Sequence, residues 1–244
     1  MNTKIEQQAQ WLGRIPSPED PRDKQYPARR LFQLIEPRVE APTGYQKWYG
    51  EVWTGDQGPT GRCTAFSMLH LLHDGPFTHR PYWDRAPMMD PTELYRKAQC
   101  LDEWGCRSAD DGTTMRAICQ ATRSFGLADH FWWFESVHEV FNYLATRGPV
   151  LMGTWWREGM EEPRQAPGEP YDGMVKYSGK YLGGHAYKAD EINMDREYIG
   201  FKNSWGTDWG DHGRFRMSFR DFETLFNEDG EVLAVTEKRL EEGG

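Results

Sequence analysis

The sequence has no long apolar run and no cluster of basic residues within its 244 positions. A membrane-spanning helix needs ~18 or more apolar residues, and the N-terminus lacks the hydrophobic segment of a secretory signal. The net charge of −9 at pH 7 argues against nucleic-acid binding through phosphate contacts, since Arg29-Arg30 is an isolated pair. We therefore expect no membrane and no nucleic-acid partner. We also expect a cytoplasmic location, with virion association or release by lysis left open.

Several common catalytic motifs are also missing. There is no G-x-S-x-G of serine hydrolases, no G-x-x-x-x-G-K-[ST] phosphate loop, no H-E-x-x-H zinc site and no G-x-G-x-x-G dinucleotide loop. The acidic residues Asp190, Glu191 and Asp195 lack the spacing of an EF-hand. The sequence therefore predicts chemistry that needs no metal and no organic cofactor.

What the sequence does contain is a set of four polar residues suited to cysteine catalysis. Gln57 precedes Cys63 by six positions, His185 follows two glycines, and Asn203 precedes Ser-Trp-Gly. A thiol hydrolase needs a nucleophile, a base, a group that orients the base, and donors for the oxyanion. We predict that Cys63 is the nucleophile and His185 the base. Asn203 would orient the base, and Gln57 would donate to the oxyanion.

Each of these residues also has a structural reading. Cys63 alone could be a small buried apolar side chain, and His185 a core histidine. His70 and His73 compete poorly for the role of base, because at 1.5 Å per residue they lie about 10 and 15 Å along the predicted helix from Cys63. A cysteine that begins a helix beside an imidazolium is expected to have a pKa below that of a free thiol.

This set resembles the papain-like cysteine peptidases, over roughly residues 48–235. The papain pattern is C-G-[SA]-C-[WY], with His and Asn far downstream. The chain departs from it at Thr60, Arg62 and Thr64, where the family has a cysteine, a small residue and an aromatic one. Further segments resemble a bacterial and bacteriophage branch of the family. These segments are 110–117, 147–150 and 208–213.

The resemblance implies an α+β, two-lobed fold whose active site lies in a cleft between a helical lobe and an antiparallel β-sheet or barrel lobe. It also implies substrate contacts at Gly112 and Gly184. Arg62, next to the nucleophile, would favour the thiolate and acidic substrate groups by Coulomb attraction. Trp205 would cover the His–Asn hydrogen bond from water and contribute to the substrate site.

The elements read from the residues agree with that division. Apolar periodicity and its stop signals predict helices at 63–72, 91–98, 114–124 and 137–145. Strand-like runs follow at 150–156, 186–192, 198–201 and 214–217. We therefore expect an extended Pro-rich segment at 1–45, a helical lobe at 46–145 with the nucleophile, and a β-rich lobe at 146–240 with His and Asn.

The N-terminal segment is too rich in proline to form the helical prodomain that zymogens of the family carry. We expect residues 11–35 to pack as an extended clasp through Trp11, Ile15, Tyr26 and Leu31. On this basis the chain should act without removal of its N-terminus.

The sequence has only four cysteines. If Cys63 stays free, Cys100, Cys106 and Cys119 give no regular disulfide framework, which suits a reducing compartment. A Cys100–Cys106 pair is possible but not implied, and the spacing fits no zinc site. We expect these three to be unpaired thiols.

The predicted function is hydrolysis of peptide bonds by a cysteine peptidase, through a thioester acyl-enzyme on Cys63 and with a peptide or protein substrate. A restricted amide hydrolase, an aminopeptidase or a transpeptidase on the same fold is an alternative. Another is a catalytically idle papain-fold protein with a structural role, for instance in a virion. The oligomeric state is left open.

Overall fold

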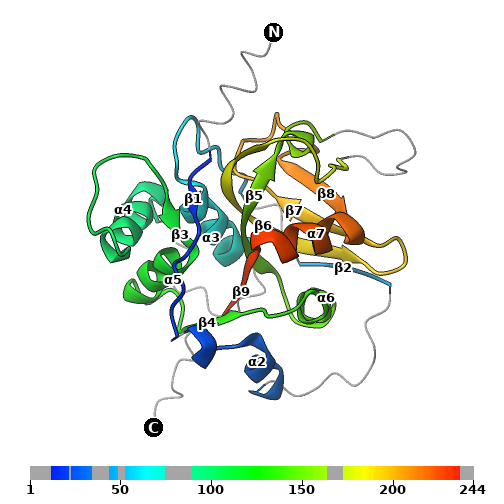
Figure 1. Ribbon diagram of the computed structural model, residues 1–244, viewed down its shortest axis with the longest axis horizontal. Coiled ribbons are helices and arrows are strands. Elements are labelled where there is room, and N and C mark those ends of the chain that lie inside the picture. The colour runs from blue at the N-terminus through cyan, green and yellow to red at the C-terminus, as the bar shows by residue number, and fades with distance from the viewer. Residues whose placement is uncertain are drawn as a thin grey trace.

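The computed structural model describes residues 12–21, 23–34, 44–48, 53–74, 89–163 and 173–236. Within them a group of helices lies on one side and a twisted sheet on the other (Figure 1). In chain order the elements are β1 (Arg14–Ile15), a 3-10 turn (Asp23–Gln25), α2 (Ala28–Leu34), β2 (Tyr45–Lys47), α3 (Cys63–Asp74), α4 (Pro91–Leu101), β3 (Thr113–Thr114), α5 (Met115–Ser124), β4 (His130–Trp133), α6 (Val137–Thr146), β5 (Val150–Arg157), a second 3-10 turn (Glu158–Met160), β6 (Tyr181–Asn193), β7 (Tyr198–Lys202), β8 (Arg214–Ser218), α7 (Phe219–Asp229) and β9 (Glu231–Thr236).

Seven strands form one antiparallel sheet in the order β4-β9-β5-β6-β7-β8, with β2 paired to β6. β6 is the longest strand and lies between β5 and β7. Alternate residues of a strand point to opposite faces, so a long central strand can present one side chain to the helices and the next to the sheet core. This strand carries His185.

Helix α3 is buried from its first residue to Leu72 because its sequence is apolar around most of its circumference. It packs on β5 and β6, with α4 and α5 beside it. The helix predicted to begin at Cys63 is therefore confirmed, as are the helices predicted at 91–98, 114–124 and 137–145.

The predicted strands are also present, and only β6 differs from its prediction by more than one residue at an end. β6 begins at Tyr181, so His185 lies inside the strand and not at its start. Strands β4 and β9 and helix α7 had no prediction. Helix α2 interrupts the segment expected to be extended, and α6 packs in the sheet core through Val140 and Leu144 although it was assigned to the helical lobe.

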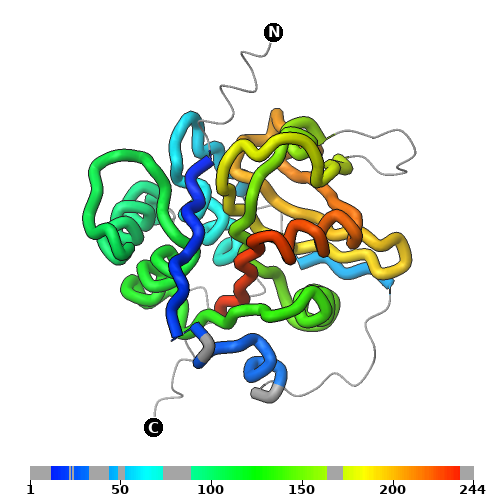
Figure 2. Tube along the Cα trace, in the orientation of Figure 1, coloured from blue at the N-terminus to red at the C-terminus, as the bar shows by residue number. Residues whose placement is uncertain are grey.

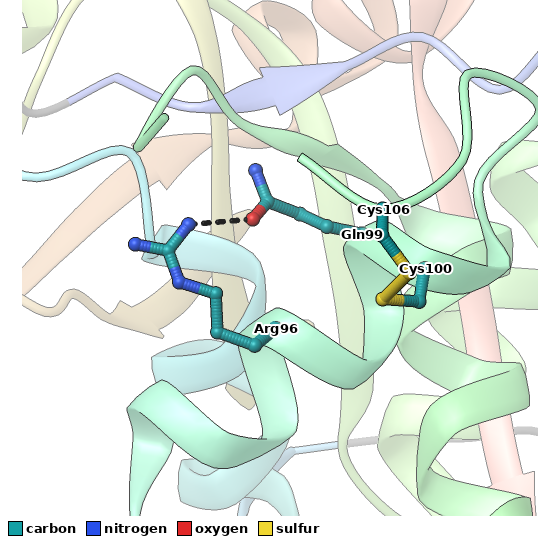
Figure 3. The surroundings of a disulfide bond; sticks show 4 residues. All are labelled: Arg96, Gln99, Cys100 and Cys106. Atoms are coloured by element: carbon teal, nitrogen blue, oxygen red, sulfur yellow. Dashed lines mark hydrogen bonds between the residues drawn. A yellow bond between two sulfur atoms is a disulfide. The ribbon is translucent and has the colours of Figure 1, made fainter. Parts of the chain in front are cut away.

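Cys100 and Cys106 form a disulfide between the end of α4 and the loop that follows (Figure 3). On the preceding turn, Arg96 donates to the side chain of Gln99 at 2.7 Å. The expectation of three unpaired thiols is therefore wrong for these two cysteines, and the cysteine argument for a reducing compartment no longer holds. Cys63 and Cys119 are free and buried.

No helix among the described residues is long and apolar enough to cross a bilayer. The described ranges leave out Trp11, one of the four residues expected to anchor the N-terminal clasp. They also leave out residues 164–172.

Candidate active site

The thiol of Cys63 lies at the junction of helix α3 and strand β6. Cys63 is the first residue of α3 and is fully buried. The backbone N–H groups of Ala186 and Gly13 are hydrogen-bond partners for its sulfur. Because Ala186 directly follows His185, the structure brings the sulfur against the part of β6 that carries the candidate base.

His185 and Asn203 are joined by a hydrogen bond of 2.7 Å between Nε2 and Oδ1. The backbone N–H of Ser204 also donates to that Oδ1, at 2.8 Å, which identifies the atom as the amide oxygen. An oxygen only accepts here, so Nε2 of His185 carries the proton. In the neutral ring Nδ1 is then the basic nitrogen.

Two tryptophans enclose the imidazole. Trp156 meets the ring edge to face, with centroids 4.9 Å apart, and Trp205 lies tilted against it at 5.0 Å. Both indoles are buried. Trp205 therefore packs directly against the ring that makes the bond to Asn203. Trp156 had only been expected to be core or cleft wall.

Gln57 is tied to the same group through Ser204. The Ser204 hydroxyl donates to Oε1 of Gln57 at 2.5 Å, and the backbone N–H of Gln57 donates to the Ser204 carbonyl at 2.8 Å. Its side-chain Nε2 donates to the carbonyl of Thr60 at 2.5 Å. The amide nitrogen of Gln57 therefore faces the loop that leads into Cys63. Ser204 is a connecting residue that the sequence pattern did not single out.

Residues 12–15 run across this site. Figure 2 shows the N-terminal segment, in blue, passing between the helices and the sheet. Strand β1 pairs in parallel with β3, with Arg14 opposite Thr113, and the Thr113 N–H donates to the Gly13 carbonyl at 2.9 Å. A Cβ on Gly184 would lie 2.1 Å from the Arg14 carbonyl oxygen. The segment is thus in close contact with both sides of the site.

Gly13, Gly112 and Gly184 have no side chain, which allows the N-terminal segment to approach this closely. A Cβ on Gly13 would lie 2.1 Å from the carbonyl oxygen of Gly61, and one on Gly112 would lie 2.2 Å from that of Gly13. Gly112 also has φ +100°, which side chains rarely adopt. Gly112 and Gly184, expected to contact substrate, instead contact residues of the chain's own N-terminal segment.

Burial sets the charge state of the site. Loss of solvation raises the pKa of the Cys63 thiol to about 11 and lowers the pKa of His185 to about 4. Nδ1 of His185 has no hydrogen-bond partner among the described residues. The pKa expected for Cys63, below that of a free thiol, is therefore wrong for this covered state, in which both groups are neutral.

Arg62 is directed away from the role that its position suggested. Its guanidinium donates to Asp110 at 2.8 Å and to the Thr92 hydroxyl at 2.8 Å. The cation whose charge acts on the Cys63 thiol is Arg14. Asp110, on the 110–112 loop, thus forms an ion pair with the Arg62 guanidinium.

Within the described residues, no group of three or more His, Cys, Asp or Glu side chains is arranged to hold a metal ion. The site consists of a thiol, an imidazole, two amides and aromatic side chains. Such a set can form a nucleophile, move one proton and stabilise an oxyanion.

No protein-family model and no curated protein matches the sequence. Solved structures do match it. Xylellain, a cysteine protease from Xylella fastidiosa, is 15% identical with a TM-score of 0.70, over 94% of this chain and 97% of that one. ProCathepsin B S9 from Trypanosoma congolense is 14% identical with a TM-score of 0.64, over 97% of this chain and 90% of that one. Procathepsin L 3 of Tenebrio molitor larval midgut is 14% identical with a TM-score of 0.64, over 96% of this chain and 79% of that one.

These matches cover nearly the whole chain, with TM-scores of 0.64 to 0.70. The chain has the papain-like cysteine protease fold.

Proposed function

We propose that the chain is a cysteine peptidase that forms a thioester on Cys63, and that residues 12–15 keep it latent. The observation that carries the proposal is the His185–Asn203 hydrogen bond through Nε2, since it leaves Nδ1 as the base on the strand that touches the thiol. The proposal rests on that geometry, because likeness of fold at this identity does not establish an activity.

The reaction follows from these groups once the segment has moved. Nδ1 of His185 takes the thiol proton, and the thiolate of Cys63 attacks the peptide carbonyl carbon. The Cys63 N–H and the Gln57 amide are the candidate donors to the oxyanion. The C–N bond breaks as His185 returns the proton to the leaving amine. Water then hydrolyses the thioester, which releases the acid and restores the thiol.

Latency has a physical basis in the covered state. A buried neutral thiol is a poor nucleophile, because the thiolate is the reactive form. The segment also occupies the path along Gly112 and Gly184 that an extended peptide would need. Displacing residues 12–15 would give both side chains access to water and remove the main cause of their shifted pKa values.

The full chain with Gly13→Val tests both parts. A valine Cβ cannot lie 2.1 Å from the Gly61 carbonyl, so the segment should leave the site. Labelling of Cys63 by iodoacetamide at pH 7 and cleavage of internally quenched peptides should both rise at least tenfold over the unmodified chain. Glu19→Ala, an exposed position on the same segment, is the matched control and should change neither.

Adding Cys63→Ala to Gly13→Val should abolish cleavage. Labelling that favours Cys63 without cleavage of any peptide would instead point to a restricted amide hydrolase or transpeptidase. If Gly13→Val leaves Cys63 no more reactive than Cys119, the chain is an idle papain-fold protein.

A further inference from the structure

A second histidine, His70, is fully buried in the apolar helix α3, seven residues after Cys63. At 3.6 residues per turn this separation is close to two turns, so the two side chains start from the same face of the helix. The Nε2 atom of His70 accepts a hydrogen bond from the backbone N–H of Gly55, at 3.2 Å. The helix that begins with the candidate nucleophile therefore also holds the chain at Gly55.

This hydrogen bond requires a neutral His70, because an imidazolium has no lone pair with which to accept. Burial lowers the pKa of His70 well below its ordinary value, and the charges of Lys202 and Lys188 act in the same direction. With Nε2 as the acceptor, the proton lies on Nδ1, which has no hydrogen-bond partner within the part of the chain that the structure describes. A buried N–H without a partner is costly, and a leucine here would avoid that cost. Packing alone therefore does not account for a histidine at this position.

Gly55 begins a short segment that ends at Gln57. The Gly55 carbonyl accepts from the Gly206 N–H at 3.3 Å, and the Gln57 N–H donates to the Ser204 carbonyl at 2.8 Å. An isolated antiparallel β-bridge joins the two segments between these bonds. The segment with Gln57 is thus tied on one side to α3, through His70, and on the other to the residues that directly follow Asn203.

The segment also lies tightly against the helix. A Cβ on Gly55 would lie 2.4 Å from the Trp53 ring and 2.6 Å from that of Phe66. The Trp53 ring in turn packs on His70, with centroids 4.7 Å apart. Gly55 is buried, so its N–H would lose its hydrogen bond if His70 were apolar, and the segment would have to shift to find another acceptor.

We propose that His70 is a positioning residue for the oxyanion. By accepting from the Gly55 N–H it fixes the segment that carries Gln57. The Gln57 amide and the Cys63 N–H, the two candidate donors, are then held by one helix at the spacing that a single oxygen needs. This inference rests on the proposed peptidase function. Because the oxygen gains its charge only as the transition state forms, a misplaced donor should lower kcat and leave KM little changed.

A structural measurement tests the hydrogen bond itself. In the unmodified chain labelled with ¹⁵N, we expect a scalar coupling across the hydrogen bond between the Gly55 amide nitrogen and Nε2 of His70. His70→Leu should speed hydrogen exchange of the Gly55 and Gln57 amides at least tenfold, whereas His70→Gln, whose side-chain oxygen can accept near the same place, should not. His73→Leu, one turn further along α3 and also beside Trp53, is the control and should leave both rates unchanged. Absence of the coupling, which needs no variant to fold, would overturn the proposal.

Kinetics separate a positioning role from a purely structural one, in the Gly13→Val chain with its site uncovered. Adding His70→Leu should lower kcat at least tenfold with KM little changed, and His70→Gln in its place should restore most of kcat. In a chain that also carries Gln57→Ala, His70→Leu should lower kcat no further, because the donor that it positions is gone. The same loss of kcat with and without Gln57 would overturn the proposal.

The two measurements distinguish failure of the inference from failure of the peptidase. The coupling with no cleavage by any of these chains would refute the peptidase and with it the role of His70 in the reaction, although the hydrogen bond would stand. Cleavage with an unchanged kcat in His70→Leu would refute the positioning role and leave the peptidase in place.

Discussion

Asn203 fixes which nitrogen of His185 can act as a base. Its oxygen accepts a hydrogen bond from the Nε2–H of His185, so loss of the amide would free the ring to turn and to change tautomer. In the uncovered chain we expect Asn203→Ala to lower kcat by roughly 10²-fold with little change in KM, a smaller loss than for His185→Ala. Asn142→Ala, at an exposed position on α6, is the control. If Asn203→Ala kept the kcat of the uncovered chain, Asn203 would not be needed to orient His185.

Glu161 provides a pH test at the scale of one side chain. It is buried, and loss of solvation raises its pKa to about 7, although it accepts a hydrogen bond from the Trp156 indole. A raised carboxyl pKa means that the folded chain binds more protons than the unfolded chain between about pH 4.5 and 7. The free energy of unfolding contributed by this group is therefore full below that window and falls as pH rises through it, by roughly 3 kcal/mol at most.

The measurement is urea unfolding of the full chain at pH 5 and pH 7.5. Glu161→Gln should reduce the loss of stability between the two values, because the glutamine side chain does not ionise. Glu139 lies on α6 and accepts a hydrogen bond from the Glu135 backbone N–H. Glu139→Gln should leave the loss of stability between the two pH values unchanged. The same loss in Glu161→Gln as in the unmodified chain would show that other groups cause it.

At the level of single residues, the sequence was most informative where a chemical role needs one residue type. A thiol, an imidazole and an amide in a fixed order predicted Cys63, His185 and Asn203, and the structure brings them together. Arg14 carried no such signal. Its hydrogen-bond partners, Asp229 and Glu231, are more than 200 positions away in the chain, and only the fold makes them neighbours.

Among the elements, β3 depends on a single buried carboxylate. Asp102 accepts hydrogen bonds from the hydroxyls of Thr113 and Thr114, at 2.5 and 2.7 Å, and from Arg107 at 2.9 Å. Its side chain is 1% exposed. β3 in turn pairs with β1, so this carboxylate supports the strand against which the N-terminal segment lies.

We expect Asp102→Ala to lower the free energy of unfolding by about 3 kcal/mol, because it leaves the hydroxyls of Thr113 and Thr114 without this acceptor and removes one partner of Arg107. Asp111→Ala is the matched control. Its side chain is 49% exposed in an ion pair with the same Arg107, and its loss should cost under about 1 kcal/mol. Denaturant unfolding measures both, and equal effects would contradict the anchoring role of Asp102.

Elements with a strong local pattern were the ones predicted correctly. Helix α3 is apolar all round, and α4 has a proline in its first turn and an aspartate cap. α7 and β9 were missed because no Gly-Pro boundary marks them, and β1 and β3 have only two residues each. Strands this short exist through pairing with each other, and pairing between positions 14 and 113 leaves no local trace in the sequence.

For the whole molecule, the structure changes the expected effect of shortening the N-terminus. The clasp prediction identified Leu31, which is buried, but it did not anticipate that the Gly13 N–H faces the Cys63 sulfur. In the proposed latent state, four extended residues take the place of a helical prodomain. We now expect deletion of residues 1–15 to raise specific activity at least tenfold.

Deletion of residues 1–34 should raise activity as well but also lower the melting temperature by several degrees. It removes Leu31 from the core and breaks the ion pair of Asp23 with Arg116, whereas the shorter deletion leaves both. Peptidase assays and thermal melts on the two truncated chains measure the difference. If neither truncated chain gained activity, the N-terminal segment would only stabilise the fold and would not inhibit it.

The ion pairs of Arg14 have a consequence for how related sequences can differ. Arg14 is paired with Asp229 and Glu231, and its side chain is fully buried. Replacing either side of this group alone would leave a buried charge without its partner, which is costly. We therefore expect positions 14, 229 and 231 to covary, with a basic residue at 14 where 229 and 231 are acidic, and apolar residues at all three positions otherwise.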